Sequence, residues 1–272
     1  MAVSGVAGDL ALAFTNVTFR RGARTILDRI SFAIAPGEFI GVLGGNGAGK
    51  STLLRLALGL LRTASGEIRV LGRDPRHAHR GVGYVPQRLE LDPELPLRAR
   101  DFVALGYDGE RWGLPLPSTE RTARVDAALR DVHAQTFADE PVGRLSGGEQ
   151  QRLAIAQAIV GRPRLILLDE PLANLDLGAA KDVVELVARL GRERAMTVLL
   201  VAHDVNPLVG ALDRVLYLAN GRSAIGPVAD IVNENVLSRL YDQPVDVIAV
   251  RGRIIVVAGE GVDPAHGRPP HS

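Results

Sequence analysis

A glycine-rich stretch followed by lysine and serine is the first segment of this chain whose residues could do chemistry. Residues 44–51 read GGNGAGKS, and an apolar run over 38–43 precedes them. Glycines let the backbone curl so that its N–H groups point inward, and such a nest binds anions. Lys50 and Ser51 then open a helix whose positive end faces the bound group. In this pattern the lysine reaches the β- and γ-phosphates of a nucleotide, and the serine hydroxyl can ligate Mg²⁺.

The use of lysine at this position is selective. Lys50 and Lys181 are the only lysines among the 32 Lys and Arg residues of the chain. Lysine carries a compact point charge, whereas arginine carries a planar fork. The alternative interpretation is an ordinary glycine turn between a strand and a helix, and the lysine argues against it.

Polar side chains follow two further apolar runs. Residues 164–168 lead into Asp169 and Glu170, and residues 197–202 lead into His203. The carboxyl ends of parallel strands meet at one edge of a sheet, so these side chains are expected to gather beside the glycine loop. A carboxylate next to a phosphate can act as a general base. His203 alone would be interpreted as a surface or capping histidine, and the shared edge favours a role in the site.

The stretch LSGGEQQR over 145–152 has a local interpretation as a helix start. Ser146 and Glu149 fit the S-x-x-E capping box, in which each side chain bonds the other residue's backbone N–H. Apolar residues recur at helical spacing behind it. The bare N–H groups of Gly147 and Gly148 at such a helix start can also bind an anion.

Taken together, GGNGAGKS, LSGGEQQR and the run LILLDEP over 165–171 resemble the ABC ATPase family over roughly residues 10–232. The resemblance implies an α/β fold: a P-loop NTPase core with a mixed sheet, an antiparallel β subdomain and an inserted helical subdomain over about 88–160. It also implies ATP and Mg²⁺ as cofactors and a motor that works as a pair of chains.

The resemblance assigns roles to individual residues. Asp169 would support Mg²⁺, Glu170 would orient and polarise the attacking water, and His203 would touch the γ-phosphate. Gln87, after an apolar run ending at Pro86, matches the Q-loop that contacts Mg²⁺ and senses the partner. The catalytic residues implied are Glu170 and His203, and the metal-binding residues are Ser51, Gln87 and Asp169. The nucleotide-binding residues implied are Arg21, Gly44, Gly45, Asn46, Gly47, Ala48, Gly49, Lys50, Ser51, Thr52, Gln87, Asp169 and, acting on a second copy of the chain, Ser146, Gly147 and Gly148.

Two positions keep a second interpretation. Residues 174–176, NLD, match the family's D-loop, but Asp176 can equally be the N-cap of a helix over 178–190; both can hold. The family usually stacks an aromatic ring on adenine shortly before the second strand. The aligned position here is Arg21, with Phe19 two residues earlier. Because a guanidinium plane can stack on a base, Arg21 is predicted to lie against the adenine.

The remaining elements follow from periodicity. Residues 10–19 and 25–34 predict antiparallel strands, and 97–107 and 118–132 predict helices in the inserted subdomain, which in the family forms a groove for a permease helix. An extension over 233–258 follows the ATPase domain of 10–232. It predicts a helix over 233–241 and a β-hairpin formed by 245–250 and 253–258. Residues 259–272 are predicted to be disordered from their composition.

The whole chain restricts the possible functions. Its 272 residues carry a net charge of +1, which gives no case for nucleic acid as a partner, and no cysteine, which excludes disulfides and thiolate metal sites. No signal peptide or apolar run of membrane-spanning length is apparent, so a transport pore would be another protein. His77, His79, His266 and His271 are interpreted as solvated histidines, because no ligand cluster accompanies them.

The resemblance implies an ATP-hydrolysing motor subunit that drives solute import through a separate permease. It would be cytoplasmic and peripheral on the inner face of the plasma membrane. Its partners would be a second copy, integral membrane permease subunits and, indirectly, an extracytoplasmic solute-binding protein. The sequence VPQR over 85–88 with Asp92 and Pro96, and the segment 240–247, resemble the zinc/manganese-type importers. The alternatives are an exporter ATPase, a non-transport ABC ATPase and a catalytically inactive binding module.

Overall fold

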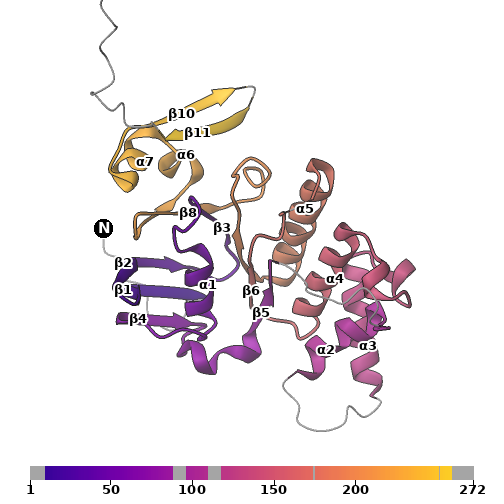
Figure 1. The fold of residues 1–272 in the computed structure, drawn as a ribbon. Helices are drawn as coiled ribbons and strands as arrows, with labels where there is room; N and C mark the ends of the chain where they lie inside the picture. Colours follow the sequence, from indigo (N-terminus) through magenta and orange to yellow (C-terminus); the bar gives the residue numbers. More distant parts are fainter. Residues whose placement is uncertain (1–9, 88–95, 110–117, 174, 251, 259–272) are drawn as a thin grey trace, which may run out of the picture.

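The computed structural model describes residues 10–87, 96–109, 118–173, 175–250 and 252–258. A mixed sheet occupies the middle of the molecule, an antiparallel sheet lies on one side, a group of helices on the other, and a C-terminal unit sits at one end (Figure 1). This is the α/β architecture predicted from the sequence: mixed sheet, antiparallel β subdomain and inserted helices.

The central sheet has six strands in the order β5-β6-β7-β3-β8-β9, all parallel except β9. Both faces are buried, because alternate residues of each strand enter two different cores. Leu167 pairs with Leu199 on one face, and Leu168 pairs with Leu200 on the other. Continuous apolar runs are typical of parallel strands covered on both sides. The strands are β3 (Phe39–Leu43), β5 (Val82–Val85), β6 (Leu165–Leu168), β7 (Thr197–Val201), β8 (Arg214–Ala219) and β9 (Arg222–Gly226).

The antiparallel sheet has the order β2-β1-β4, formed by β1 (Leu12–Arg21), β2 (Arg24–Ile34) and β4 (Ser65–Val70). Antiparallel pairing of the first two strands was predicted and is confirmed. The rings of Phe14 and Phe32 stack with centroids 4.7 Å apart. Together with helix α1 (Lys50–Ala57), this sheet covers one face of the central sheet.

Helices cover the opposite face. Helix α2 (Ala99–Asp108) and helix α3 (Thr119–Asp131) lie close to their predicted ranges and pack against α4 (Gly147–Ile159). Helix α5 (Leu177–Arg194) runs four residues beyond its predicted end at Leu190. Arg192 and Arg194 lie in its last turn, where their positive charges interact favourably with the negative end of the helix dipole. Arg194 also pairs with Asp131 of α3. No helix in the described ranges is long and apolar enough to span a bilayer.

The C-terminal unit starts after β9. It contains α6 (Val228–Ile231), α7 (Glu234–Tyr241) and a hairpin of β10 (Val245–Val250) and β11 (Arg253–Ala258). The predicted helix and hairpin are therefore both present, and Asn233 caps α7 through its side chain. Strand β11 contacts the loop after β7, because Asn206 exchanges two hydrogen bonds with Ile254.

Short 3₁₀ turns connect several elements: η1 (Pro75–His77), η2 (His79–Gly81), η3 (Gln135–Phe137) and η4 (Val142–Arg144). Some positions named from the sequence lie outside the described residues. They are Arg88, Asp92, Asn174 and the tail 259–272, which includes His266 and His271.

Candidate functional site

The glycine loop adopts backbone angles that side chains would resist. Gly44 has φ 143° and Gly49 has φ 102°, both in the region that favours glycine. A Cβ added to Gly44 would collide with the carbonyl oxygen of Leu218 on the neighbouring strand. The loop from 44 to 49 therefore joins β3 to α1 in a tight curl, as the predicted phosphate-binding nest requires.

Lys50 is buried at the start of α1, with only 5% of its surface exposed. Its Nζ donates to the carbonyl oxygens of Gly44, at 2.8 Å, and Gly45, at 3.1 Å. Burial lowers the pKa of the ammonium, and the carboxylates of Glu170 and Asp169 partly oppose that shift. The ammonium therefore bonds two carbonyl oxygens of the loop, at a place where a phosphate would be a stronger acceptor.

Ser51 and Asp169 meet at the next position. The Ser51 hydroxyl donates to Asp169 Oδ1 at 3.2 Å, joining the start of α1 to the end of β6. Asp169 is only 6% exposed, and burial raises the pKa of its carboxyl, an effect that the Ser51 hydrogen bond opposes. A buried carboxylate beside a hydroxyl offers the oxygen ligands that Mg²⁺ prefers, and a cation there would offset the cost of burying the charge. These two residues fit a magnesium ion.

Glu170 follows β6, and its carboxylate contacts residues that follow the two neighbouring strands. Its Oε2 accepts a hydrogen bond from Gln87 Nε2 at 2.6 Å and lies 2.9 Å from His203 Nε2. Gln87 follows β5 and His203 follows β7, so neighbours on both sides of β6 hold the carboxylate. Glu170 also has φ 51°, an unusual angle for a residue with a side chain, and such angles cluster at functional sites.

The stretch over 145–152 forms the capping box predicted from its sequence. The Ser146 hydroxyl accepts from the Glu149 backbone N–H at 3.4 Å, and Glu149 Oε2 accepts from the Ser146 backbone N–H at 2.8 Å. The Ser146 hydroxyl also donates to Glu149 at 2.7 Å, and this bond lowers the pKa of the carboxyl. A Cβ on Gly147 or Gly148 would meet no atom within 4 Å, so this helix start is open on its outer side.

The capping box is not part of the group around Lys50 and Glu170. Helix α4 lies with α2 and α3 on the other side of the central sheet from α1 (Figure 1). Asp176 caps α5 by accepting from the Ala179 N–H at 2.9 Å, which is the local role expected for it. One chain therefore brings together the phosphate loop, the two carboxylates, Gln87 and His203. The capping box of the same chain lies away from this group.

Arg21 lies at the exposed end of β1, opposite Arg24 across the turn to β2. A pocket of about 380 Å³ beside the glycine loop is lined by Arg24 and, from the C-terminal unit, Tyr241; Arg21 is not among its lining residues. Sequence reasoning missed Tyr241, because nothing in its local pattern links the end of α7 to the loop. The prediction for Arg21 stays a prediction.

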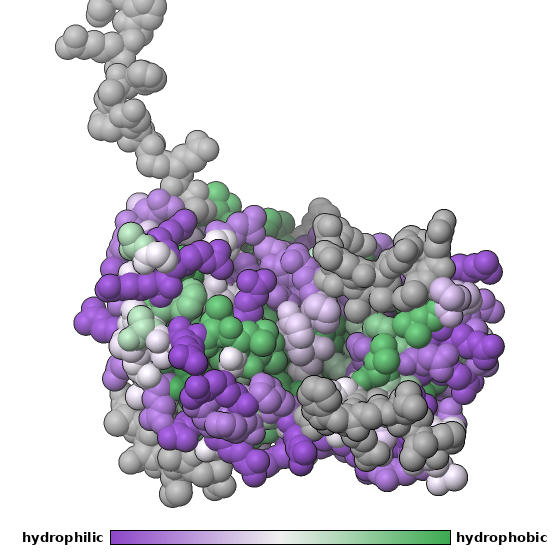
Figure 2. Space-filling view, turned by 60° about the horizontal axis from the view of Figure 1, so that its bottom comes forward, coloured by the Kyte–Doolittle hydropathy of each residue, from purple (hydrophilic) through white to green (hydrophobic). Residues whose placement is uncertain are grey.

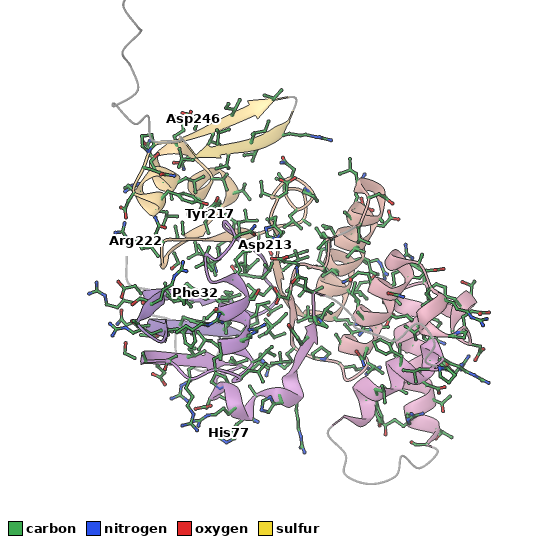
Figure 3. The ribbon with its side chains drawn as sticks, in the orientation of Figure 1. Phe32, His77, Asp213, Tyr217, Arg222 and Asp246 are labelled. Atoms are coloured by element: carbon green, nitrogen blue, oxygen red, sulfur yellow. The ribbon has the colours of Figure 1, made fainter. Side chains whose placement is uncertain are left out.

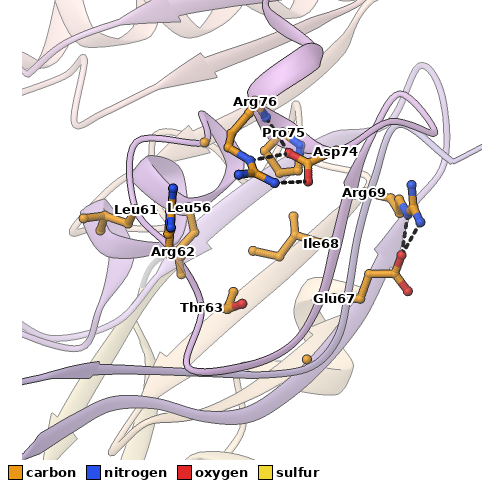
Figure 4. Close-up of a pocket in the computed structure, with 12 residues that line it drawn as sticks. Leu56, Leu61, Arg62, Thr63, Glu67, Ile68, Arg69, Asp74, Pro75 and Arg76 are labelled. Atoms are coloured by element: carbon orange, nitrogen blue, oxygen red, sulfur yellow. Dashed lines mark hydrogen bonds and ion pairs between the residues drawn. The ribbon is translucent and has the colours of Figure 1, made fainter.

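A second pocket of about 360 Å³ lies between the C-terminal end of α1, β4 and η1, apart from these residues (Figure 4). Its charged side chains are largely paired with one another: Arg76 with Asp74 and Arg69 with Glu67. The bidentate Arg76 contact lowers the pKa of Asp74. This pocket offers no unpartnered carboxylate for acid–base chemistry.

Comparison with known proteins agrees with this geometry. The family model described as ABC transporter matches residues 27–173. The manganese transport system ATP-binding protein MntB of Bacillus subtilis (strain 168) is 34% identical over 226 residues, which cover 83% of this chain and 90% of that protein. The zinc import ATP-binding protein ZnuC of Yersinia enterocolitica is 40% identical over 203 residues, 75% of this chain and 73% of that protein.

Among solved structures, the dimeric ATP-binding cassette MJ0796 in a post-hydrolysis state, bound to ADP and phosphate, is 29% identical. It aligns with a TM-score of 0.68 over 80% of this chain and 98% of its own. The fold, the matched family model and both relatives lead to the same conclusion: the chain belongs to the ABC transporter family as one of its ATPases, the proteins that bind and hydrolyse ATP.

Proposed function

We propose that this protein is the motor subunit of an importer for a divalent metal ion such as zinc or manganese. The observation that carries the hydrolytic part is the convergence of Gln87 and His203 on one oxygen of Glu170, next to the buried Lys50. The proposed cargo comes from the relatives, both of which are named for metal transport.

The phosphates of ATP are proposed to lie in the loop 44–49 and against Lys50 and the N-terminal turn of α1, which includes Thr52. Lys50 would exchange its bonds to the carbonyls of Gly44 and Gly45 for phosphate oxygens, a stronger charge-assisted contact. Ser51 and Asp169, with Gln87 close by, are proposed to hold Mg²⁺, which neutralises charge on the phosphates when bound.

Glu170 is proposed to orient and deprotonate the attacking water. Its side chain is 12% exposed, so it is partly open to solvent, and Gln87 and His203 orient one of its carboxylate oxygens. His203 is half exposed and can turn from Glu170 towards a γ-phosphate. General-base assistance of this kind is typically worth about 10²–10⁴ in rate.

The active unit is proposed to be two copies of the chain. The open helix start at Ser146, Gly147 and Gly148 can bind an anion, but it lies apart from the phosphate loop of its own chain. A second copy arranged head to tail would bring this helix start to the γ-phosphate of the first. The dimeric relative that holds ADP and phosphate supports such a pair.

The ATPase domain is proposed to span 10–232, with the helical subdomain over about 88–160 and the C-terminal extension over 233–258. The helical side is the proposed docking surface for membrane permease subunits, at the inner face of the plasma membrane. A view with the bottom of the molecule turned forward shows apolar areas among polar ones (Figure 2). An extracytoplasmic solute-binding protein would supply the metal ion to the permease.

Gene deletion with complementation tests the proposal. Cells lacking the gene, grown under metal starvation, should hold less zinc or manganese than wild type, as measured by elemental analysis. Wild-type protein should restore the content, and Lys50→Ala should not, because the buried ammonium at the loop is lost. Normal zinc, manganese and iron in the deleted strain would refute metal import and leave the ATPase assignment intact.

A further inference from the structure

The pocket of about 380 Å³ next to the glycine loop has the position that a nucleoside needs. If phosphates lie in the loop, the sugar and base attached to them must lie against adjoining surface. Three separate segments and one residue of the C-terminal extension form its walls. They are Arg24, Thr25 and Ile26 of β2, Gly45 to Ala48 of the loop, Ala219 to Gly221 between β8 and β9, and Tyr241 at the end of α7.

Tyr241 is the aromatic residue among the described residues that line this pocket, and a second tyrosine packs against its ring. Its hydroxyl lies 3.2 Å from the hydroxyl of Tyr217, which is only 6% exposed on β8. The two rings meet edge to face with centroids 6.2 Å apart. The Tyr241 hydroxyl also lies next to Gly45, since a Cβ built there would be 3.7 Å away. The ring is thus fixed beside the loop before any ligand arrives.

The end of α7 is tied to the turn between β8 and β9. Asn220 Nδ2 donates to the Tyr241 carbonyl oxygen at 2.8 Å. Arg222 Nη1 donates to the Arg239 carbonyl oxygen at 3.1 Å and to Asp242 Oδ1 at 2.8 Å. Figure 3 shows Tyr217 and Arg222 in the region between the C-terminal unit and the antiparallel sheet. A site with a pre-positioned aromatic ring loses little side-chain freedom on binding.

We propose that Tyr241 is the aromatic wall against which the nucleoside part of ATP lies, so that the C-terminal extension completes the nucleotide site. This inference rests on the proposed binding of phosphate by the loop. Aromatic rings stack on bases of every kind, and Thr25 and Arg24 supply polar groups in the same pocket. Arg21, exposed at the end of β1, does not line this pocket.

A fluorescence experiment with two ligands tests the role of Tyr241. Trp112 is the only tryptophan of the chain, so Trp112→Phe combined with Tyr241→Trp gives a single reporter in the pocket. ATP should change its emission, and tripolyphosphate, which lacks a nucleoside, should bind without that change. In the chain with its natural Trp112, Tyr241→Leu should weaken ATP binding about 5- to 100-fold and leave tripolyphosphate binding unaltered.

Matched variants separate the ring from its surroundings. Tyr241→Phe keeps the ring and loses only the hydroxyl contact, so it should retain most of the ATP affinity that Tyr241→Leu loses. Tyr217→Phe removes the same contact from a residue that does not line the pocket and should have the same small effect. Ile248→Ala, on the exposed side of the hairpin, controls for general disturbance of the extension. Equal loss of ATP and tripolyphosphate affinity in Tyr241→Leu would overturn the inference, because the ring would then only shape the loop.

The outcomes also distinguish this inference from the function beneath it. Lys50→Ala should lose both ligands. A wild-type chain that binds neither ligand refutes the proposed function and the inference together. A wild-type chain that binds both ligands, with an unchanged ATP affinity in Tyr241→Leu and a silent reporter, overturns only the role of Tyr241.

Discussion

His203 Nε2 lies 2.9 Å from Glu170 Oε2, the same oxygen that accepts a hydrogen bond from Gln87. This contact joins the ends of β6 and β7, and the Gln87 bond adds the end of β5. These two contacts orient one carboxylate oxygen, and the proposed base would use the other to meet a water. Changes at any of the three residues should therefore act on turnover more than on nucleotide affinity.

The variant Glu170→Gln should bind ATP and nearly stop hydrolysing it. The amide keeps the shape of the carboxylate and loses the base, so turnover should fall by about 10²–10⁴. Phosphate release by purified protein and an ATP-binding titration measure the two effects. Turnover within about threefold of wild type would remove Glu170 from the role of base, since assistance by a general base is worth far more.

The variant His203→Ala should lower turnover while Glu170 stays in place. It removes one of the two contacts on Glu170 Oε2 and the group proposed to touch the γ-phosphate. A loss of about 10² or more in turnover is expected, with little change in ATP affinity. His79→Ala, at an exposed position in η2, is the control and should match wild type. Similar rates in both histidine variants would contradict the role of His203.

The sequence predicted which side chains meet where each of them directly follows a buried parallel strand. Asp169, Glu170 and His203 follow apolar strands, and parallel strands bring their carboxyl ends to one edge, so their meeting with Lys50 followed from order alone. The capping box could also be predicted, because Ser146 and Glu149 lie three residues apart at the first turn of one helix.

Tyr241 could not be predicted in the same way. Its place beside the loop depends on how α7 docks on the turn between β8 and β9, through Asn220 and Arg222. Such contacts join segments about 20 residues apart and leave no periodic signal. The predicted end of α5 was wrong for a related reason. The last turn of this helix is stabilised by the pairing of Arg194 with Asp131, a residue of another helix.

The variant Arg21→Ala tests the original assignment of the adenine contact. If the guanidinium lies on the base, ATP binding should weaken by about 0.5–2 kcal/mol, the range for a cation over a ring. Binding should be measured for both ATP and GTP. Unchanged dissociation constants for both nucleotides would exclude Arg21 from the site. If Tyr241→Leu then lost ATP affinity in the same assay, the adenine contact would be assigned to the C-terminal extension.

The variant Ser146→Ala should lower stability in a pH-dependent way. The native hydrogen bonds lower the pKa of Glu149. The stability that they contribute is therefore fully present above the pKa that a glutamate has in the unfolded chain, about 4.3. That stability is lost as pH falls through the lower pKa of the folded chain. Loss of the cap should cost about 0.5–2 kcal/mol at neutral pH, and the difference from wild type should narrow in acid.

Urea unfolding at neutral and acidic pH measures this effect. Ser118→Ala is the matched control, because Ser118 caps α3 by the same contact but has Arg121 where the box has its glutamate. Its cost should not vary with pH in the acidic range. A cost that is equal at all pH values in Ser146→Ala would contradict the contribution of the Glu149 carboxylate.

The last prediction concerns the pair of chains. Helix α4, which begins at Gly147, packs on the face of the central sheet opposite to α1 and the phosphate loop, so a composite site needs a second copy. Isolated protein should be mostly monomeric without nucleotide, because the ligand itself forms much of the contact. In the Glu170→Gln background, ATP with Mg²⁺ should produce a dimer that persists because hydrolysis is blocked. Adding Ser146→Arg should prevent it, since a long side chain then occupies the open helix start. Light scattering gives the mass in each state, and equal dimerisation with and without ATP, or none in either state at high protein concentration, would argue against the ATP-dependent pair.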